Sequence, residues 1–177
     1  MRAAMKTGTA RAPLSTASQS PPIKGNVGLA ERYREAWQRI SAGLAEDRPF
    51  EAIAIAESII SNRLRSYLFG GASLSEDEAS KKRFVTTAEL IRRVKAKAVS
   101  GDEDYSFCQM LAAWLKRRNS ALHGLVSSYP GLPPMKSLED FLSSARRTAV
   151  DGAELGKEVS KWHRRKLREY RKLGKSE

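Results

Sequence analysis

Cysteine and histidine are both scarce in this chain of 177 residues, and their scarcity excludes several kinds of site. Cys108 is the single cysteine, so no internal disulfide can form, and His123 and His163 are the two histidines. Zinc sites need clusters of such ligands. The sequence therefore predicts no metal site, and we expect no cofactor.

Long apolar runs are missing as well. No segment approaches the ~20 consecutive apolar residues that a membrane-spanning helix needs, so we expect no membrane partner. A single free cysteine fits a reducing compartment, and we expect a cytoplasmic protein.

Acidic residues are absent from the start of the chain, where the first is Glu31. Residues 1–27 are rich in Ser, Thr, Pro and Ala, which predicts a disordered basic arm. We expect a helical bundle over residues 28–160 and a basic helical tail over residues 161–177.

With 32 Lys and Arg against 20 Asp and Glu, the net charge is +12. Such a surface attracts polyanions, so RNA is the expected partner. The alternative is a basic protein with no nucleic-acid role.

Strand-like alternation is absent, and apolar residues recur instead at helical spacing. The pattern predicts an all-α fold, a bundle of about five helices. The second helix carries apolar residues on most sides and should lie at the centre. Thr86 to Glu89 reads as a capping box, while Gly152 and Gly156 could loosen the last helix midway. The expected helices span about 29–44, 49–68, 87–99, 102–126 and 137–173.

Near the end of the fourth expected helix stand Arg118, Asn119 and His123. An imidazole can move a proton near neutral pH, and a guanidinium can hold a phosphate through two hydrogen bonds. Together they are the minimum set for metal-free chemistry on a phosphodiester. Because Arg118 and His123 are five residues apart, they lie about 140° apart around a helix axis. Arg118 must therefore reach around, or meet a histidine from another chain. The alternative is two cations at a helix C-terminus, before Gly124.

This motif resembles that of the HEPN superfamily, in which arginine, a polar residue and three further residues precede histidine. HEPN domains are all-helical, and many are metal-independent ribonucleases of toxin–antitoxin, abortive-infection and CRISPR systems. The resemblance covers about residues 29–160. It implies a metal-independent endoribonuclease, a toxin or an effector of antiviral defence, with an antitoxin or regulatory partner. It also implies a homodimer in which two motifs face one cleft. Some HEPN toxins carry a tyrosine where this chain has Leu125, so that variant is not expected.

The resemblance also implies a role for each motif residue. His123 would act as general base on a ribose 2′-OH or as general acid on the leaving 5′-oxygen. Arg118 would stabilise charge in the transition state, and Asn119 would position the phosphate or the histidine. Two alternatives remain. One is a non-catalytic HEPN-like module that binds RNA or protein, and the other is an unrelated basic helical nucleic-acid-binding protein.

Glu57 lies on the apolar stripe of the second expected helix, where a carboxylate needs a partner. We expect it to pair with Arg118 or to orient His123, and either arrangement would assist catalysis. The alternatives are a structural ion pair with Arg63 or Arg65, or an exposed position.

Basic residues outside the motif are candidates for nucleic-acid binding. Two of them flank the motif, and the others lie in the tail, where an aromatic ring could stack on bases. The alternatives are solvated helix ends and rings that pack back on the bundle. His163, among these cations, is expected at the surface. The candidates are Lys116, Arg117, Lys161, Trp162, Arg164, Arg165 and Lys166.

Overall fold

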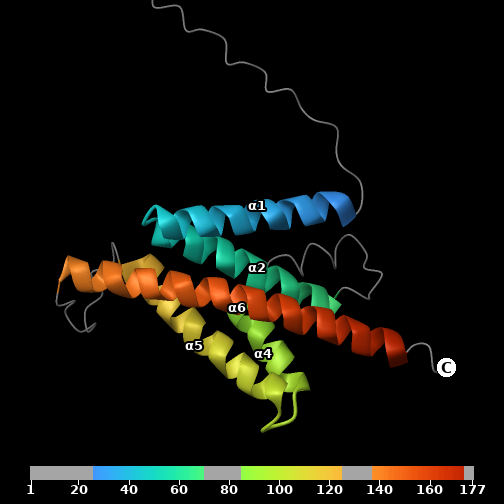
Figure 1. The fold of residues 1–177 in the computed structure, drawn as a ribbon. Coiled ribbons are helices and arrows are strands. Elements are labelled where there is room, and N and C mark those ends of the chain that lie inside the picture. Colours follow the sequence, from blue (N-terminus) through green and yellow to red (C-terminus); the bar gives the residue numbers. More distant parts are fainter. Residues whose placement is uncertain (1–25, 70–84, 125–136, 174–177) are drawn as a thin grey trace, which may run out of the picture.

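The computed structural model describes residues 26–69, 85–124 and 137–173, and this part of the chain consists of five helices without a strand (Figure 1). The all-α prediction is confirmed. Residues 1–25 of the expected N-terminal arm lie outside the described residues, whereas residues 26 and 27, predicted to belong to the arm, are the first two residues of α1. The helices are α1 (Asn26–Ala45), α2 (Pro49–Phe69), α4 (Thr87–Lys97), α5 (Glu103–Gly124) and α6 (Leu138–Leu173).

Helices α4, α5 and α6 begin where short polar side chains cap them. Thr86 accepts a hydrogen bond from the Glu89 amide at 3.3 Å, as the capping-box pattern predicts. Ahead of α6, the Ser137 hydroxyl accepts from the Asp140 amide at 3.0 Å. Asp102 accepts from the amide of Tyr105 at 2.6 Å, so it caps α5.

Helix α2 contacts each of the other four helices and is the centre of the bundle. Its apolar side chains are almost completely buried, and Ile53, Ile60 and Leu64 are each 0% exposed. The predicted burial on most sides is therefore confirmed. Helix α6 crosses in front of α2 in Figure 1, and α1 packs beside α2.

Helix α6 runs unbroken for 36 residues, through both glycines that could have loosened it. The expected boundary between bundle and tail, at residue 160, falls inside this helix. At Gly152 an added Cβ would lie 2.7 Å from Cζ2 of Trp114, and at Gly156 one would lie 3.0 Å from Cη2 of Trp37. The glycines thus let two indole rings approach the helix backbone closely. Trp114 is 0% exposed and donates from Nε1 to the Thr148 carbonyl at 3.0 Å.

We expect Gly152→Ala to destabilise the protein. Alanine gains up to about 1 kcal/mol in helix propensity, but its methyl group would overlap the buried Trp114 ring. Overpacking of this kind typically destabilises by about 1–3 kcal/mol, so the net effect is a loss, measurable by urea unfolding. Gly156→Ala is the matched control, because Trp37 is only partly buried and can shift. A more stable Gly152→Ala protein would contradict the close packing.

Candidate functional site

Arg118 is held by two side chains in the structure. Its Nη2 forms an ion pair with Oε2 of Glu57, and its Nη1 donates to Oδ1 of Asn119 at 2.8 Å. The side chains of Arg118 and Glu57 are 21% and 18% exposed, so the pair is shielded from most of the solvent. The guanidinium plane is therefore fixed at the edge of the bundle.

Glu57 could have paired with Arg118, Arg63 or Arg65, and in the structure it pairs with Arg118. Arg63 lies instead over the Tyr33 ring, 3.9 Å from its centroid. Arg65 donates to the Val85 carbonyl at 3.2 Å.

The second oxygen of Glu57 is also bonded. Thr87, in the first turn of α4, donates from its hydroxyl to Oε1 of Glu57 at 2.9 Å. One carboxylate on α2 thereby joins α4 and α5. Removal of Glu57 would leave the charge of Arg118 and the hydroxyl of Thr87 without these bonds.

A polar cleft of about 470 Å³ opens beside this network. Helix α2 contributes Glu57, Ser61 and Arg65, α5 contributes Arg118 and Asn119, and the first turn of α4 lines the remaining side. Amides at a helix N-terminus carry partial positive charge, which favours an anion. The volume lies in the range of small-ligand sites. Two guanidinium groups, Arg65 and Arg118, face the single carboxylate of Glu57, so the lining keeps a net positive charge that suits an oxyanion.

His123 lies elsewhere on α5, in its last turn. The side chain is exposed, it does not line the cleft, and it forms no hydrogen bond or ion pair with another described residue. The possibility that Glu57 orients His123 is therefore not realised. The offset of about 140° between Arg118 and His123 explains the separation. Gly124, the next residue, packs directly against the Phe141 ring of α6.

The two cations that flank the motif differ in their surroundings. Arg117 forms an ion pair with Asp151 of α6 at 3.0 Å. Lys116 is exposed and has no acidic partner within the described ranges. Lys116 is thus the one that remains available to a phosphate.

Trp162 belongs to the core, and the prediction that it stacks on bases is wrong for this structure. It is 5% exposed, with ring centroids 4.8 Å from Tyr67 and 5.9 Å from Phe107. Its Nε1 donates to Oδ1 of Asp104 at 2.8 Å. The ring has an apolar pocket and a hydrogen-bond acceptor, which together fix it in the bundle.

His163 is also buried, against the expectation of a surface position. It is 3% exposed, and its Nε2 lies 3.1 Å from the Ser66 hydroxyl of α2. Burial, with a smaller effect from the nearby Arg63, lowers the pKa of His163, so the ring is neutral at pH 7. His163 is therefore a packing residue, and His123 is left as the exposed histidine.

Two tail cations attach α6 to the start of α5. Arg165 pairs with Glu103 at 2.9 Å, and Lys166 pairs with Asp104 at 2.6 Å. Both side chains were predicted to bind nucleic acid, and in the structure both are paired with carboxylates instead. Lys161 pairs with Glu158 at 2.7 Å, where both side chains are more than half exposed, and such a pair is weak. Arg164 is exposed and has no acidic partner in the described part of the chain.

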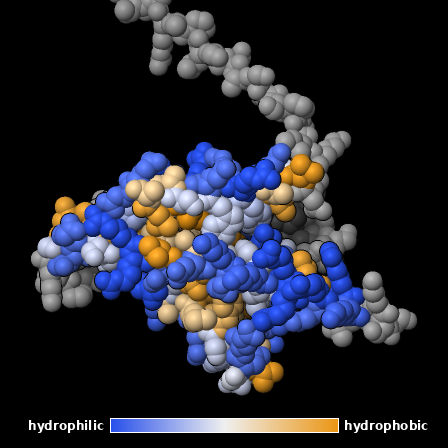
Figure 2. Space-filling view, viewed as in Figure 1, coloured by the Kyte–Doolittle hydropathy of each residue, from blue (hydrophilic) through white to orange (hydrophobic). Residues whose placement is uncertain are grey.

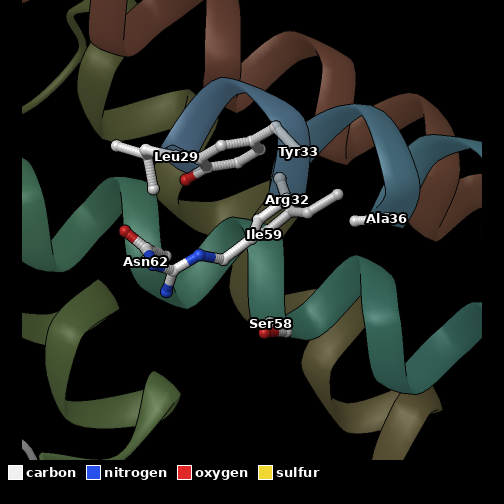
Figure 3. Close-up of a pocket in the computed structure, with 7 residues that line it drawn as sticks. All are labelled: Leu29, Arg32, Tyr33, Ala36, Ser58, Ile59 and Asn62. Carbon is white, nitrogen blue, oxygen red and sulfur yellow. The ribbon is translucent and has the colours of Figure 1, made fainter. Parts of the chain in front are cut away.

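A second hollow lies between α1 and α2, with a volume of about 180 Å³ (Figure 3). The Arg32 side chain extends across it toward Asn62, and the Tyr33 ring lies above (Figure 3). It holds none of the residues that the sequence marks as functional, so we assign it no role.

Neither a metal cluster nor a reactive thiol is found among the residues that the structure describes. No group of three His, Cys, Asp or Glu residues there could hold a metal ion. Burial raises the pKa of Cys108 to about 11, so the thiol stays protonated at pH 7. None of the described helices is long and apolar enough to cross a membrane.

Comparison with known proteins gives no relative, since no protein-family model, curated protein or solved structure matches the chain. The chemistry of the site therefore follows from its own residues. They supply a fixed guanidinium, a polar cleft beside it and an exposed imidazole on the same helix.

We expect strong energetic coupling between Glu57 and Arg118. Glu57→Gln and Arg118→Gln should each lower the free energy of unfolding by about 1–3 kcal/mol, because each leaves a shielded charge without its partner. A double-mutant cycle measured by urea unfolding should give a coupling of at least about 1 kcal/mol. The control cycle is Glu158→Gln with Lys161→Gln, whose exposed pair should couple by less than about 0.5 kcal/mol. Equal coupling in the two cycles would show that the Glu57–Arg118 pair is not special.

Proposed function

We propose that this protein is a metal-independent endoribonuclease of the HEPN type, with Arg118 and His123 as its catalytic residues. The observation that carries the proposal is the double restraint on Arg118 by Glu57 and Asn119 at the edge of a polar cleft. A restrained guanidinium can stabilise a phosphorane-like transition state without first reorganising. The first turn of α4, which lines the cleft, adds positive potential.

Arg118 keeps donors for a substrate although it is paired. A guanidinium has five N–H groups, and the bonds to Glu57 and Asn119 use one on each terminal nitrogen. One N–H therefore remains on Nη1 and one on Nη2. This pair of donors matches two oxygens of a phosphodiester.

His123 supplies the proton transfer in this proposal. A neutral imidazole takes the proton of a ribose 2′-OH, and O2′ attacks phosphorus while the P–O5′ bond breaks. The imidazolium formed in this way gives the proton to the leaving 5′-oxygen, so His123 acts first as general base and then as general acid. The products are a 2′,3′-cyclic phosphate and a 5′-OH, and DNA is not cleaved because it lacks the nucleophile.

A homodimer would bring the two groups together. Arg118 and His123 of one chain lie on different sides of α5, so each arginine would work with His123 of a second copy across a two-fold interface. We place the enzyme in the cytoplasm, as a toxin or an anti-phage effector restrained by an antitoxin or another regulatory protein.

The second candidate function is a non-catalytic RNA-binding module. The ion pair that orients Arg118 is also what a structural role would require, and the net charge of +12 favours RNA in either case. Cleavage assays on the motif variants distinguish the two functions.

We expect the wild-type protein to cleave single-stranded RNA in EDTA and His123→Ala to lose at least about 100-fold in rate, the lower range for loss of a general acid–base group. Ser120→Ala is the matched control, because Ser120 is an exposed residue three positions earlier on α5. It should cleave at the wild-type rate. Full activity in His123→Ala, with an unchanged circular dichroism spectrum, would remove the histidine from the mechanism.

We also expect Arg118→Gln and His123→Ala, each inactive alone, to regain cleavage when they are refolded together. A mixed dimer has one complete site and one site lacking both groups, so about a quarter of wild-type activity should return. Each variant refolded by itself is the control. A dimer by sedimentation with no recovered activity would mean that each chain uses its own arginine and histidine.

A further inference from the structure

The cations of α6 between Lys157 and Arg171 fall into two sets that differ in their partners. Lys157, Lys161, Arg164, Arg168 and Arg171 recur at intervals of four, three, four and three residues, so they share one side of the helix. All five are exposed. They extend over about 21 Å at 1.5 Å per residue. We call these five residues the α6 stripe.

Arg165 and Lys166 form the other set, which is set apart by its acidic partners. Their charges are balanced by Glu103 and Asp104 of α5. Within the stripe, Lys161 has its exposed pair with Glu158. The other four members have no acidic partner in the described ranges. Composition alone merges these two sets into one basic run.

Hydrophilic side chains gather over the C-terminal half of α6 on the face in view in Figure 2. Like charges three and four residues apart repel one another and weaken a helix. The remainder of α6 offsets that repulsion by packing against α2 and α5. A row of exposed cations, most of them without an acidic partner in the described ranges, presents a linear positive surface, which complements a linear polyanion.

We propose that the α6 stripe binds the phosphate backbone of the RNA substrate at a distance from the cleavage site. The assignment of RNA as the polyanion rests on the proposed function. The stripe itself is made of cations alone, because Trp162 is buried and the exposed Tyr170, two residues after Arg168, lies on the other side of the helix. We therefore expect the stripe to hold the backbone without reading bases.

The stripe is remote from the motif. The two ends of the motif lie beside different parts of α6, since Gly124 packs on Phe141 and Arg117, next to Arg118, pairs with Asp151. At 1.5 Å per residue, Lys157 is about 24 Å along α6 from Phe141 and about 9 Å from Asp151, whereas Arg171 is about 45 Å from Phe141 and about 30 Å from Asp151. Only an RNA that spans this distance can contact both the stripe and the catalytic groups. The stripe should therefore lower KM for long RNAs and leave kcat unchanged.

The test compares two triple variants with the same change in net charge. Arg164→Gln/Arg168→Gln/Arg171→Gln removes three members of the stripe, and Arg32→Gln/Arg34→Gln/Arg39→Gln removes three exposed arginines of α1. One probe is a single-stranded RNA of about 20 nucleotides, which exceeds ~45 Å even at the ~3.4 Å spacing of a stacked strand. The other has about 4 nucleotides. Binding is measured by fluorescence anisotropy in the His123→Ala background, and cleavage in the active protein.

For the long RNA, the plot of log K against log salt should be less steep in the stripe variant than in the wild type. Each lost phosphate contact lowers the slope by ~0.7, so the loss of the three arginines should lower it by about two. Over a fourfold rise in salt, the variant should therefore lose about 20-fold less affinity than the wild type. KM for the long RNA should rise, while kcat and all values for the short RNA should stay unchanged. The α1 variant should keep a salt slope near that of the wild type.

Several results would overturn the proposal. An equal effect in the α1 variant would mean that net charge, and not the stripe, is responsible. A fall in kcat would place the stripe at the active cleft. Equal competition by poly-glutamate and by RNA would assign the stripe to an acidic protein. Because binding is measured in an inactive background, an absence of cleavage would count against the proposed function and leave the test of the stripe intact.

Discussion

The carboxylate of Glu57 is the constraint around which the candidate site is arranged. Helix α2 is surrounded by the other four helices, and a charge on it is unfavourable unless it is paired and hydrogen-bonded. Both oxygens meet this requirement, one with Arg118 of α5 and one with Thr87 of α4. The same bonds fix the guanidinium and place the start of α4 beside it. Stability of the bundle and orientation of the proposed catalytic arginine thus depend on one side chain.

Much of the fold could be predicted because each element carries a local signal. Helical spacing defined α2, and Thr86 with Glu89 marked the beginning of α4 to the residue. The pairing of Glu57 with Arg118 could be anticipated only as one of several options, because the choice among Arg63, Arg65 and Arg118 depends on how α2 and α5 pack. Sequence spacing also indicated that His123 and Arg118 face different ways, as the structure has them.

The tail was harder to predict because its composition conceals its periodicity. Trp162 and His163 continue the buried side of α6 that includes Ala149, Ala153 and Val159, although basic residues surround them. Burial of an aromatic ring against Tyr67 outweighs the basic character of its neighbours. Reading the helical period through the basic run would have identified both residues. The role of Gly152 had no such signal, since it depends on a Trp114 ring from another helix.

The chemical nature of the products tests the central claim most directly. An RNA with a single unmodified ribose among 2′-O-methyl nucleotides would be incubated with the protein in EDTA, and the fragments identified by mass spectrometry. Cleavage through Arg118 and His123 should occur only after the unmodified ribose, and should leave a 2′,3′-cyclic phosphate and a 5′-OH. Fragments with a 5′-phosphate and a 3′-OH, or cleavage that needs added metal, would contradict the account.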